Sequence, residues 1–317
     1  MRGCQAPMMT TREGVQSTLH AGASNARGIA AMLCSMACFV TSDTLIKIVG
    51  RDMPVGEIMF ARGSFAVIIV GVMLLAQGGL PQIKPAFTPI VAWRTFVEVG
   101  STVFFFTGLM RLPFADAAAI GQFTPLAVTA GAAMFLGEPV GWRRWLATAV
   151  GLVGVLMIIR PGTSAFNPAA ILIVICVFFV AARDLITKQM GSGVPILVLI
   201  LISAGAVAMT GLFGLLIETW VVPTPAMIGG LALSAIGVTG GYYAAIVAMR
   251  AGELSVVAPF RYSAMLFALM WGYIIFDEVP APTTWIGIAI VVTAGVYMFH
   301  RENVRKRQAT SMAQAAR

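Results

Sequence analysis

Ionisable side chains stand inside long apolar stretches of this sequence, where they could pair with one another or hold a charged group. Asp43 and Lys47 lie four residues apart near the end of an apolar run that begins at Gly28. A run of about 20 apolar residues can cross a bilayer, and an ionisable residue inside one is costly and therefore a functional candidate. Two interpretations stay open: a self-neutralising pair with Lys47 reaching outward, or a gate or ion-coupling carboxylate.

Two further charged pairs occupy the next apolar runs. Glu57 and Arg62 are five residues apart, which is a poor spacing for partners on one helix, so Arg62 is expected to pair with Asp43. Arg94 and Glu98 are four apart, and we expect them to pair on one helix face with Arg94 reaching the membrane interface. A structural ion pair and a functional role both stay open for each.

The same spacing returns in the second half of the chain, at Asp184 and Lys188. Arg183 precedes Asp184 directly, and adjacent residues of a helix are expected to point in different directions. A role in fixing topology is the alternative to a role in function.

Arg261 is the strongest candidate for contact with a bound anion. It lies about seven residues into an apolar run, or about 10 Å deep, where a lone cation is expensive. Tyr262 adds a hydroxyl, and a guanidinium can bind a carboxylate or phosphate through two parallel hydrogen bonds. Pairing of Arg261 with Glu98 or Asp184 is the alternative.

Gln122 occupies the matching part of an earlier run. Pro125 follows it closely, so we expect a kink that turns polar groups of this run toward the cavity in which Arg261 would meet its anion. Simple helix packing is the alternative.

Composition restricts the class of protein. The chain has 317 residues, of which 59% are hydrophobic and 11% charged, and its mean hydropathy is +0.90. Soluble domains carry about 25% charged residues, so this is an integral membrane protein. The net charge of +8 needs no nucleic-acid partner, because cytoplasmic loops of membrane proteins are rich in Lys and Arg.

Catalytic and cofactor chemistry is not expected. His20 and His300 lie in a tail and at the end of the last run, which leaves no nucleophile, base and metal grouping. Cys34 and Cys38 share a helix face but have no further ligand nearby, so no metal site is expected. The chain has no G-x-x-x-x-G-K-[ST] phosphate loop, which argues against nucleotide-driven work.

Ten apolar runs predict an all-α protein with ten transmembrane helices. They are continuous rather than alternating, which argues against a barrel. The runs are 28–49, 56–77, 90–110, 114–136, 143–160, 168–190, 195–217, 226–249, 254–276 and 282–300.

The distribution of basic residues predicts the orientation in the membrane. If the N-terminus is inside, the inner segments hold fourteen Lys and Arg residues, and the outer segments hold Arg51, Arg111 and Arg160. Both termini are therefore predicted to be cytoplasmic.

The two halves of the chain echo each other. Asp43, Lys47 and Gly50 recur 141 positions later as Asp184, Lys188 and Gly191. A second echo relates Gly154, Val155, Met157 and Arg160 to Gly295, Val296, Met298 and Arg301. Because five spans per half is an odd number, the second half must enter the membrane from the opposite face. Inverted repeats place a binding site near the midplane between them.

The chain is therefore expected to divide into four segments. These are a disordered tail 1–27, two repeats 28–160 and 166–300, and a basic tail 301–317.

The closing signatures of the two halves carry a family resemblance. Leu136-Gly137-Glu138 closes the fourth run and Phe276-Asp277-Glu278 the ninth, each followed by a Gly-rich run. These features resemble the drug/metabolite transporter superfamily in its ten-helix form with two EamA-type domains. Residues 257–280 resemble a subgroup that includes S-adenosylmethionine and amino-acid transporters.

The resemblance implies a secondary carrier in a bacterial cytoplasmic membrane. It would move a small polar metabolite, such as an amino acid or S-adenosylmethionine, by alternating access, with a coupling ion or an exchanged metabolite as partner and no cofactor. A flippase of a lipid-linked head group, a membrane-embedded enzyme and a channel are the alternatives, and a homodimer is left open.

Overall fold

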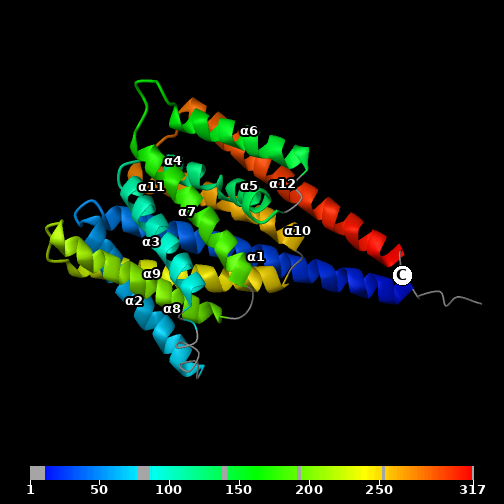
Figure 1. Ribbon diagram of the computed structural model, residues 1–317, viewed down its shortest axis with the longest axis horizontal. Helices are drawn as coiled ribbons and strands as arrows, with labels where there is room; N and C mark the ends of the chain where they lie inside the picture. Colours follow the sequence, from blue (N-terminus) through cyan, green and yellow to red (C-terminus); the bar gives the residue numbers. More distant parts are fainter. Residues whose placement is uncertain are drawn as a thin grey trace, which may run out of the picture.

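All regular structure is helical in the part of the chain that the computed structural model describes, which is residues 11–77, 86, 88–137, 141–190, 194–251 and 254–315 (Figure 1). The first half contains α1 (Thr11–Val49), α2 (Val55–Ala76), α3 (Pro89–Leu109), α4 (Phe114–Gly121), α5 (Thr124–Phe135) and α6 (Trp142–Ile159). The second contains α7 (Ala169–Met190), α8 (Ile196–Phe213), the 3-10 turn η3 (Gly214–Leu216), α9 (Pro225–Ala251), α10 (Leu254–Val257), the 3-10 segment η4 (Ala258–Tyr262), α11 (Ser263–Phe276) and α12 (Pro282–Ala315). Ten segments of these residues are long and apolar enough to cross a membrane, which confirms the predicted spans.

Proline marks where six of the described helices begin. Pro54, Pro113 and Pro195 directly precede α2, α4 and α8, and α3, α9 and α12 begin at Pro89, Pro225 and Pro282. The missing N–H of proline costs nothing there, because the first N–H groups of a helix have no partner within it.

The two terminal helices extend beyond the apolar runs. Residues 11–27 belong to α1, although the sequence led us to expect a disordered tail over 1–27; residues 1–10 lie outside the described residues. The tail expected from Arg301 likewise continues α12 to Ala315. Neither extension contains proline, so nothing in it stops a helix that the membrane span has already nucleated. The start of α1 and the end of α12 lie at the same end of the molecule (Figure 1).

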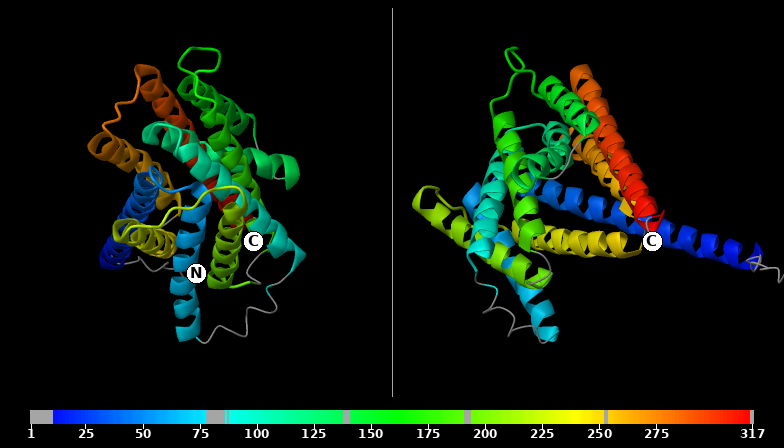
Figure 2. Two further views of the ribbon diagram at one scale, coloured as in Figure 1. Left: turned by 90° about the vertical axis from the view of Figure 1, so that its left-hand side faces the viewer. Right: turned by 45° about the vertical axis from the view of Figure 1, so that its right-hand side comes forward.

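The packing of helices follows the inverted repeat. α1 packs on α9, and α3 packs on α7. In each of these pairs the first span of one half contacts the third span of the other half. α2 packs on its counterpart α8, and α6 packs on its counterpart α12 (Figure 2). These pairings are those of two five-span units related by a two-fold axis, and they confirm the predicted architecture.

Two glycines let α6 and α12 approach closely. A Cβ built on Gly287 would lie 2.6 Å from the carbonyl oxygen of Gly154, and one built on Gly154 would lie 3.0 Å from that of Gly287. Small residues at such a crossing bring two membrane helices into backbone contact. Large apolar side chains from both halves, among them Ile46, Phe106 and Ile173, are fully buried in a common core.

One span in each half is broken at matching positions. The fourth span changes from α4 to α5 at Gln122 and Phe123, and Pro125 stands in the first turn of α5. The ninth span passes through η4, which contains Pro259, before α11 begins at Ser263. The kink expected near Pro125 is therefore present as a helix break.

Candidate functional site

A cavity of about 370 Å³ lies between the two halves. Helices α2 and α3 line it from the first half, and α7, α8 and α9 line it from the second. Most of its charged lining lies near the start of α3 and the end of α7, which is the end of the bundle where the chain termini lie. The cavity therefore lies at the interface between the two repeats, nearer to the end of the bundle that carries the chain termini.

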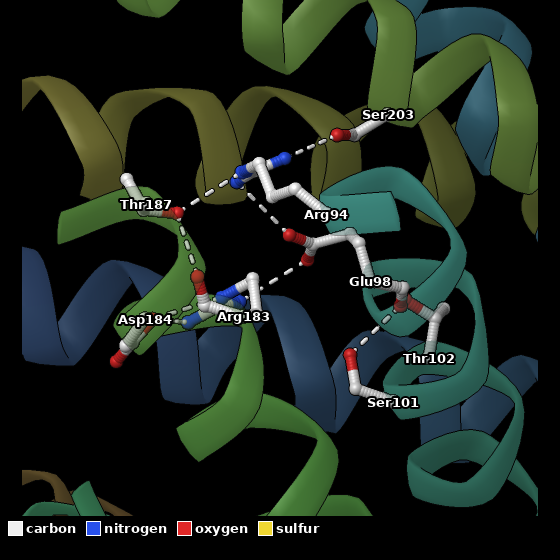
Figure 3. Close-up of polar contacts among 8 residues, drawn as sticks. All are labelled: Arg94, Glu98, Ser101, Thr102, Arg183, Asp184, Thr187 and Ser203. Atoms are coloured by element: carbon white, nitrogen blue, oxygen red, sulfur yellow. Dashed lines mark hydrogen bonds and ion pairs between the residues drawn. The ribbon is translucent and has the colours of Figure 1, made fainter. Parts of the chain in front are cut away.

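Four charged residues form a continuous ionic chain along the cavity wall (Figure 3). Arg94 Nη2 lies 3.1 Å from Glu98 Oε2, and Arg183 Nη1 lies 3.1 Å from Glu98 Oε1. Arg183 Nη2 lies 2.8 Å from Asp184 Oδ1. Glu98 of the first half thus sits between an arginine of its own helix and one of the second half, so the chain joins the two halves through charge.

Neutral groups fix the Arg94 end of this chain. Arg94 donates from Nε to Thr187 Oγ1 at 3.2 Å and from Nη1 to Ser203 Oγ at 2.6 Å. Thr187 in turn donates to the carbonyl oxygen of Arg183. Because the side chains of Arg94, Glu98 and Arg183 are only 12–19% exposed, each depends on these partners to offset its lost hydration.

Arg62 reaches the same cavity from α2. Its Nη2 donates to Ser42 Oγ at 3.1 Å, and its guanidinium carbon lies 5.3 Å from the centre of the Phe106 ring. Asp43 interacts with Arg62 electrostatically, but the two are not among the ion pairs within 4.0 Å found in the described part of the chain. The expected contact pair is therefore wrong in its geometry, because Ser42, the neighbour of Asp43, receives the hydrogen bond.

Lys47 has a partner from the other half of the chain. Its Nζ lies 2.8 Å from Glu278 Oε1 and donates to the carbonyl oxygen of Leu112 at 2.7 Å. Glu278 Oε2 accepts from the backbone N–H of Phe114, the first residue of α4. The expected self-neutralising pair of Asp43 and Lys47 is thus wrong, because Lys47 pairs instead with Glu278, from the loop that follows α11.

A second polar connection lies beside the first. Arg160 donates to Thr284 Oγ1 at 2.9 Å, and Thr284 donates to Asp116 Oδ1 at 3.1 Å. We call these residues, together with Lys47 and Glu278, the latch. Lys47, Asp116 and Arg160 belong to the first half, and Glu278 and Thr284 to the second. The latch joins helix ends opposite to the chain termini, so it holds the halves together at the end away from the ionic chain.

The remaining candidates lie elsewhere. Arg261 is exposed and does not line the cavity, and Glu98 and Asp184 pair with other arginines, so the alternative pairing expected for Arg261 is wrong. Tyr262 is buried against Phe299. Gln122 caps the end of α4 outside the cavity lining, and Lys188 is exposed.

The sequence analysis names all four residues of the ionic chain, but it does not predict that Arg183 pairs with Glu98 across the two halves. Arg94 points into the cavity rather than to the interface, although its predicted pairing with Glu98 is confirmed. Arg183 and Asp184 meet despite being adjacent, because the long arginine side chain folds back onto the carboxylate. Tyr242 also lines the cavity and packs edge-on against Phe39, and its aromatic type was the only signal for it.

The part of the chain that the structure describes contains no group of three or more His, Cys, Asp and Glu residues able to hold a metal ion. The charged groups that line the cavity are guanidinium groups, which suit carboxylates, and carboxylates, which suit ammonium or sulfonium groups.

Comparison with known proteins gives a consistent picture. Residues 26–160 and 167–300 each match the EamA-like transporter family. The chain is 25% identical to an S-adenosylmethionine uptake transporter of Rickettsia prowazekii, over 87% of this chain and 93% of that protein. It is 29% identical to a riboflavin transporter of Rhizobium johnstonii, over 63% of this chain and 67% of that one. It is 26% identical to a pseudopaline exporter of Pseudomonas aeruginosa, over 83% and 93%.

Proposed function

The chain belongs to the EamA-like transporter family, and from this premise we propose that it is a secondary carrier of a zwitterionic metabolite, an amino acid or a derivative such as S-adenosylmethionine. That it is a small-molecule transporter follows from its relatives. The substrate class and the alternating-access cycle are the parts that we infer.

The ionic chain supports the substrate class. Arg62, Arg94 and Arg183 bring guanidinium groups to one cavity, and Glu98 and Asp184 bring carboxylates. A substrate with both an anionic and a cationic group can replace the water bound to both kinds of residue, whereas a neutral solute would displace that water and offer only weaker hydrogen bonds in return. The apolar walls and Tyr242 accommodate a substrate with a bulky or planar remainder.

The latch supports alternating access. It closes one end of the interface between the halves, while the charged lining of the cavity lies toward the other end. With the orientation predicted from the Lys and Arg distribution, the latch is on the outer side and this conformation is inward-open. Opening the outer side would require Lys47 to separate from Glu278, and Thr284 from Asp116.

The relatives narrow the substrate only in part. One relative is named for the uptake of S-adenosylmethionine and another for the transport of riboflavin, and both of these molecules contain ring systems. A third relative is named for the export of pseudopaline. S-adenosylmethionine carries an α-ammonium, a carboxylate and a sulfonium, which match the charges of the cavity, so it is the first substrate to test. The substrate contact expected for Arg261 stays a prediction.

The test is uptake by the purified protein in proteoliposomes. Labelled S-adenosylmethionine and labelled amino acids are offered with and without the same solute inside, because an exchanging carrier is accelerated by internal substrate. We expect saturable uptake that falls at least about tenfold in Glu98→Gln, since the variant leaves two guanidinium groups without their shared carboxylate. Asp52→Asn, which changes an exposed acid outside the cavity and the latch, is the matched control. Uptake that does not saturate, or that Glu98→Gln leaves unchanged, would overturn the proposal.

A further inference from the structure

The three arginines of the cavity differ in how many of their hydrogen-bond donors are used. Arg94 uses Nε, Nη1 and Nη2, on Thr187, Ser203 and Glu98. Arg183 uses Nε and Nη2 on Asp184 and Nη1 on Glu98. A guanidinium has five N–H donors on three nitrogens, so every nitrogen of these two groups already has an acceptor.

Arg62 is the exception. Only its Nη2 donates to a described residue, Ser42, and its buried Nε has no hydrogen-bond partner among the residues that the structure describes. A buried donor without an acceptor is costly, and a native site that keeps one usually receives the acceptor from a ligand or water.

The position of Arg62 is nonetheless fixed. Its guanidinium faces the ring of Phe106 from α3, and Ser42 Oγ accepts from its Nη2. Ser42 is itself buried and is tied to Ser234 of α9, with 2.8 Å between the two hydroxyl oxygens. Arg62 is therefore held by contacts with α1 and α3, and α9 fixes the Ser42 hydroxyl that it contacts, while its Nε and Nη1 have no acceptor among the described residues. This is the arrangement of a preorganised anion site.

The charges of the lining agree with this assignment. Three guanidinium groups face the cavity with two carboxylates, Glu98 and Asp184. Asp43 offsets Arg62 electrostatically from outside the lining but forms no ion pair with it within 4.0 Å. An arriving anion would therefore find a cation at Arg62 whose charge is balanced at a distance and whose Nε and Nη1 donate to no described residue.

Asp184 offers the complementary group for a cation. Both hydrogen bonds from Arg183 go to its Oδ1, and its side chain is 36% exposed, the most exposed in the ionic chain. In Figure 3 its other oxygen points away from Arg183.

We propose that Arg62 binds the carboxylate of the transported solute through Nε and Nη1, and that Asp184 receives its ammonium group. This assignment rests on the proposed function and specifies an α-amino acid as the part of the substrate that is recognised. Arg94, Glu98 and Arg183 then act as the fixed wall between the two subsites rather than as the groups that bind substrate.

The experiment compares ligands that differ only at the carboxylate. Binding of S-adenosylmethionine, L-methionine and L-phenylalanine, each compared with its primary carboxamide, is measured by isothermal titration on the full chain in lipid nanodiscs. We expect the parent to bind at least one of the three acids about 10- to 100-fold more tightly than its carboxamide, which is the range for hydrogen bonds to a charged group. Arg62→Gln should remove that preference while changing the affinity for the carboxamide less than about twofold. Arg111→Gln, which changes an exposed arginine outside the cavity, should keep it.

Ser42→Ala provides a second variant in case Arg62→Gln does not fold. It removes the acceptor that orients Arg62 but leaves the charge, so we expect the preference for the acid to fall about threefold to tenfold. If the parent binds none of the three acids, the amino-acid class fails and the proposed function fails with it. If the parent binds an acid and transports it, but both variants keep the preference for the acid over the carboxamide, Arg62 is not the anion site and only the present assignment is overturned.

Discussion

Replacing Glu278 by Gln should release the latch. The variant keeps the size of the side chain and an oxygen that can accept from the N–H of Phe114, but it removes the charge that faces Lys47. Lys47, whose side chain is 11% exposed, then keeps the carbonyl of Leu112 and the adjacent aromatic rings but has no counter-ion in contact among the described residues.

The size of the effect follows from this burial. Removing one partner of a buried ion pair costs about 3–5 kcal/mol, and the 24% exposure of the Glu278 side chain places this pair at the lower end, at about 3 kcal/mol. Since the cost falls only on the conformation in which the latch is closed, the ratio of latch-open to latch-closed protein should rise about a hundredfold.

A single cysteine in the cavity reports that ratio. Thr239 lines the cavity and bonds only to the carbonyl of its own helix, so Thr239→Cys in a background without the four native cysteines disturbs little. A membrane-impermeant thiol reagent is added on the outer side of right-side-out vesicles. We expect labelling of this cysteine to be up to about a hundredfold faster with Glu278→Gln than with Glu278. Asp52→Asn is the control for loss of an acid at the same end of the molecule. Equal labelling rates with and without the Glu278→Gln substitution in folded protein would refute the role of the latch.

Three further predictions follow from the packing, the site and the topology. Glu98→Gln should lower the thermal unfolding midpoint as well as uptake, because about 3 kcal/mol of pairing is lost from two buried arginines; a midpoint equal to that of the parent would contradict this. Gly287→Ala should destabilise the protein by about 1–3 kcal/mol by forcing α6 and α12 apart, whereas Gly229→Ala, at a helix position with open space around it, should not; denaturation of both in one detergent decides. A cysteine replacing Asp52 should react with an impermeant reagent from outside intact cells and one replacing Gln77 only after lysis, and the reverse pattern would overturn the orientation.

The hydropathy pattern and the internal sequence repeat were enough to predict the architecture. A membrane span is a local property of about 20 residues, so ten runs could be counted without knowing the fold. The inverted relation followed from an odd number of spans per half, and the exchange of partners between α1–α9 and α3–α7 bears it out.

The partners of the charged residues could not be predicted in the same way. Lys47 and Glu278 are 231 residues apart. The internal sequence repeat shows which positions of the two halves correspond, but not which residues are in contact. Spacing along one helix predicted that Arg94 pairs with Glu98, but it gave no sign that Arg183 joins them from α7.

Arg261 shows why depth counted along a regular helix does not fix the position of a side chain. Its distance along the ninth span was estimated for a regular helix, but the residue lies in η4, where the chain follows a 3-10 path with three rather than 3.6 residues per turn. The side chain therefore takes a different direction from the one that a continuous helix would give it, and it is exposed outside the cavity.

Protection of the cavity by substrate tests the central claim most directly. Thr239→Cys is labelled from the side on which the cavity is open while a transported amino acid or S-adenosylmethionine is titrated in. If the solute binds between the two halves beside the ionic chain, labelling slows in proportion to occupancy and is half-maximal near the KM for uptake. Uptake at its full rate, with labelling unchanged at saturating solute, would show that the transported molecule does not pass through this cavity.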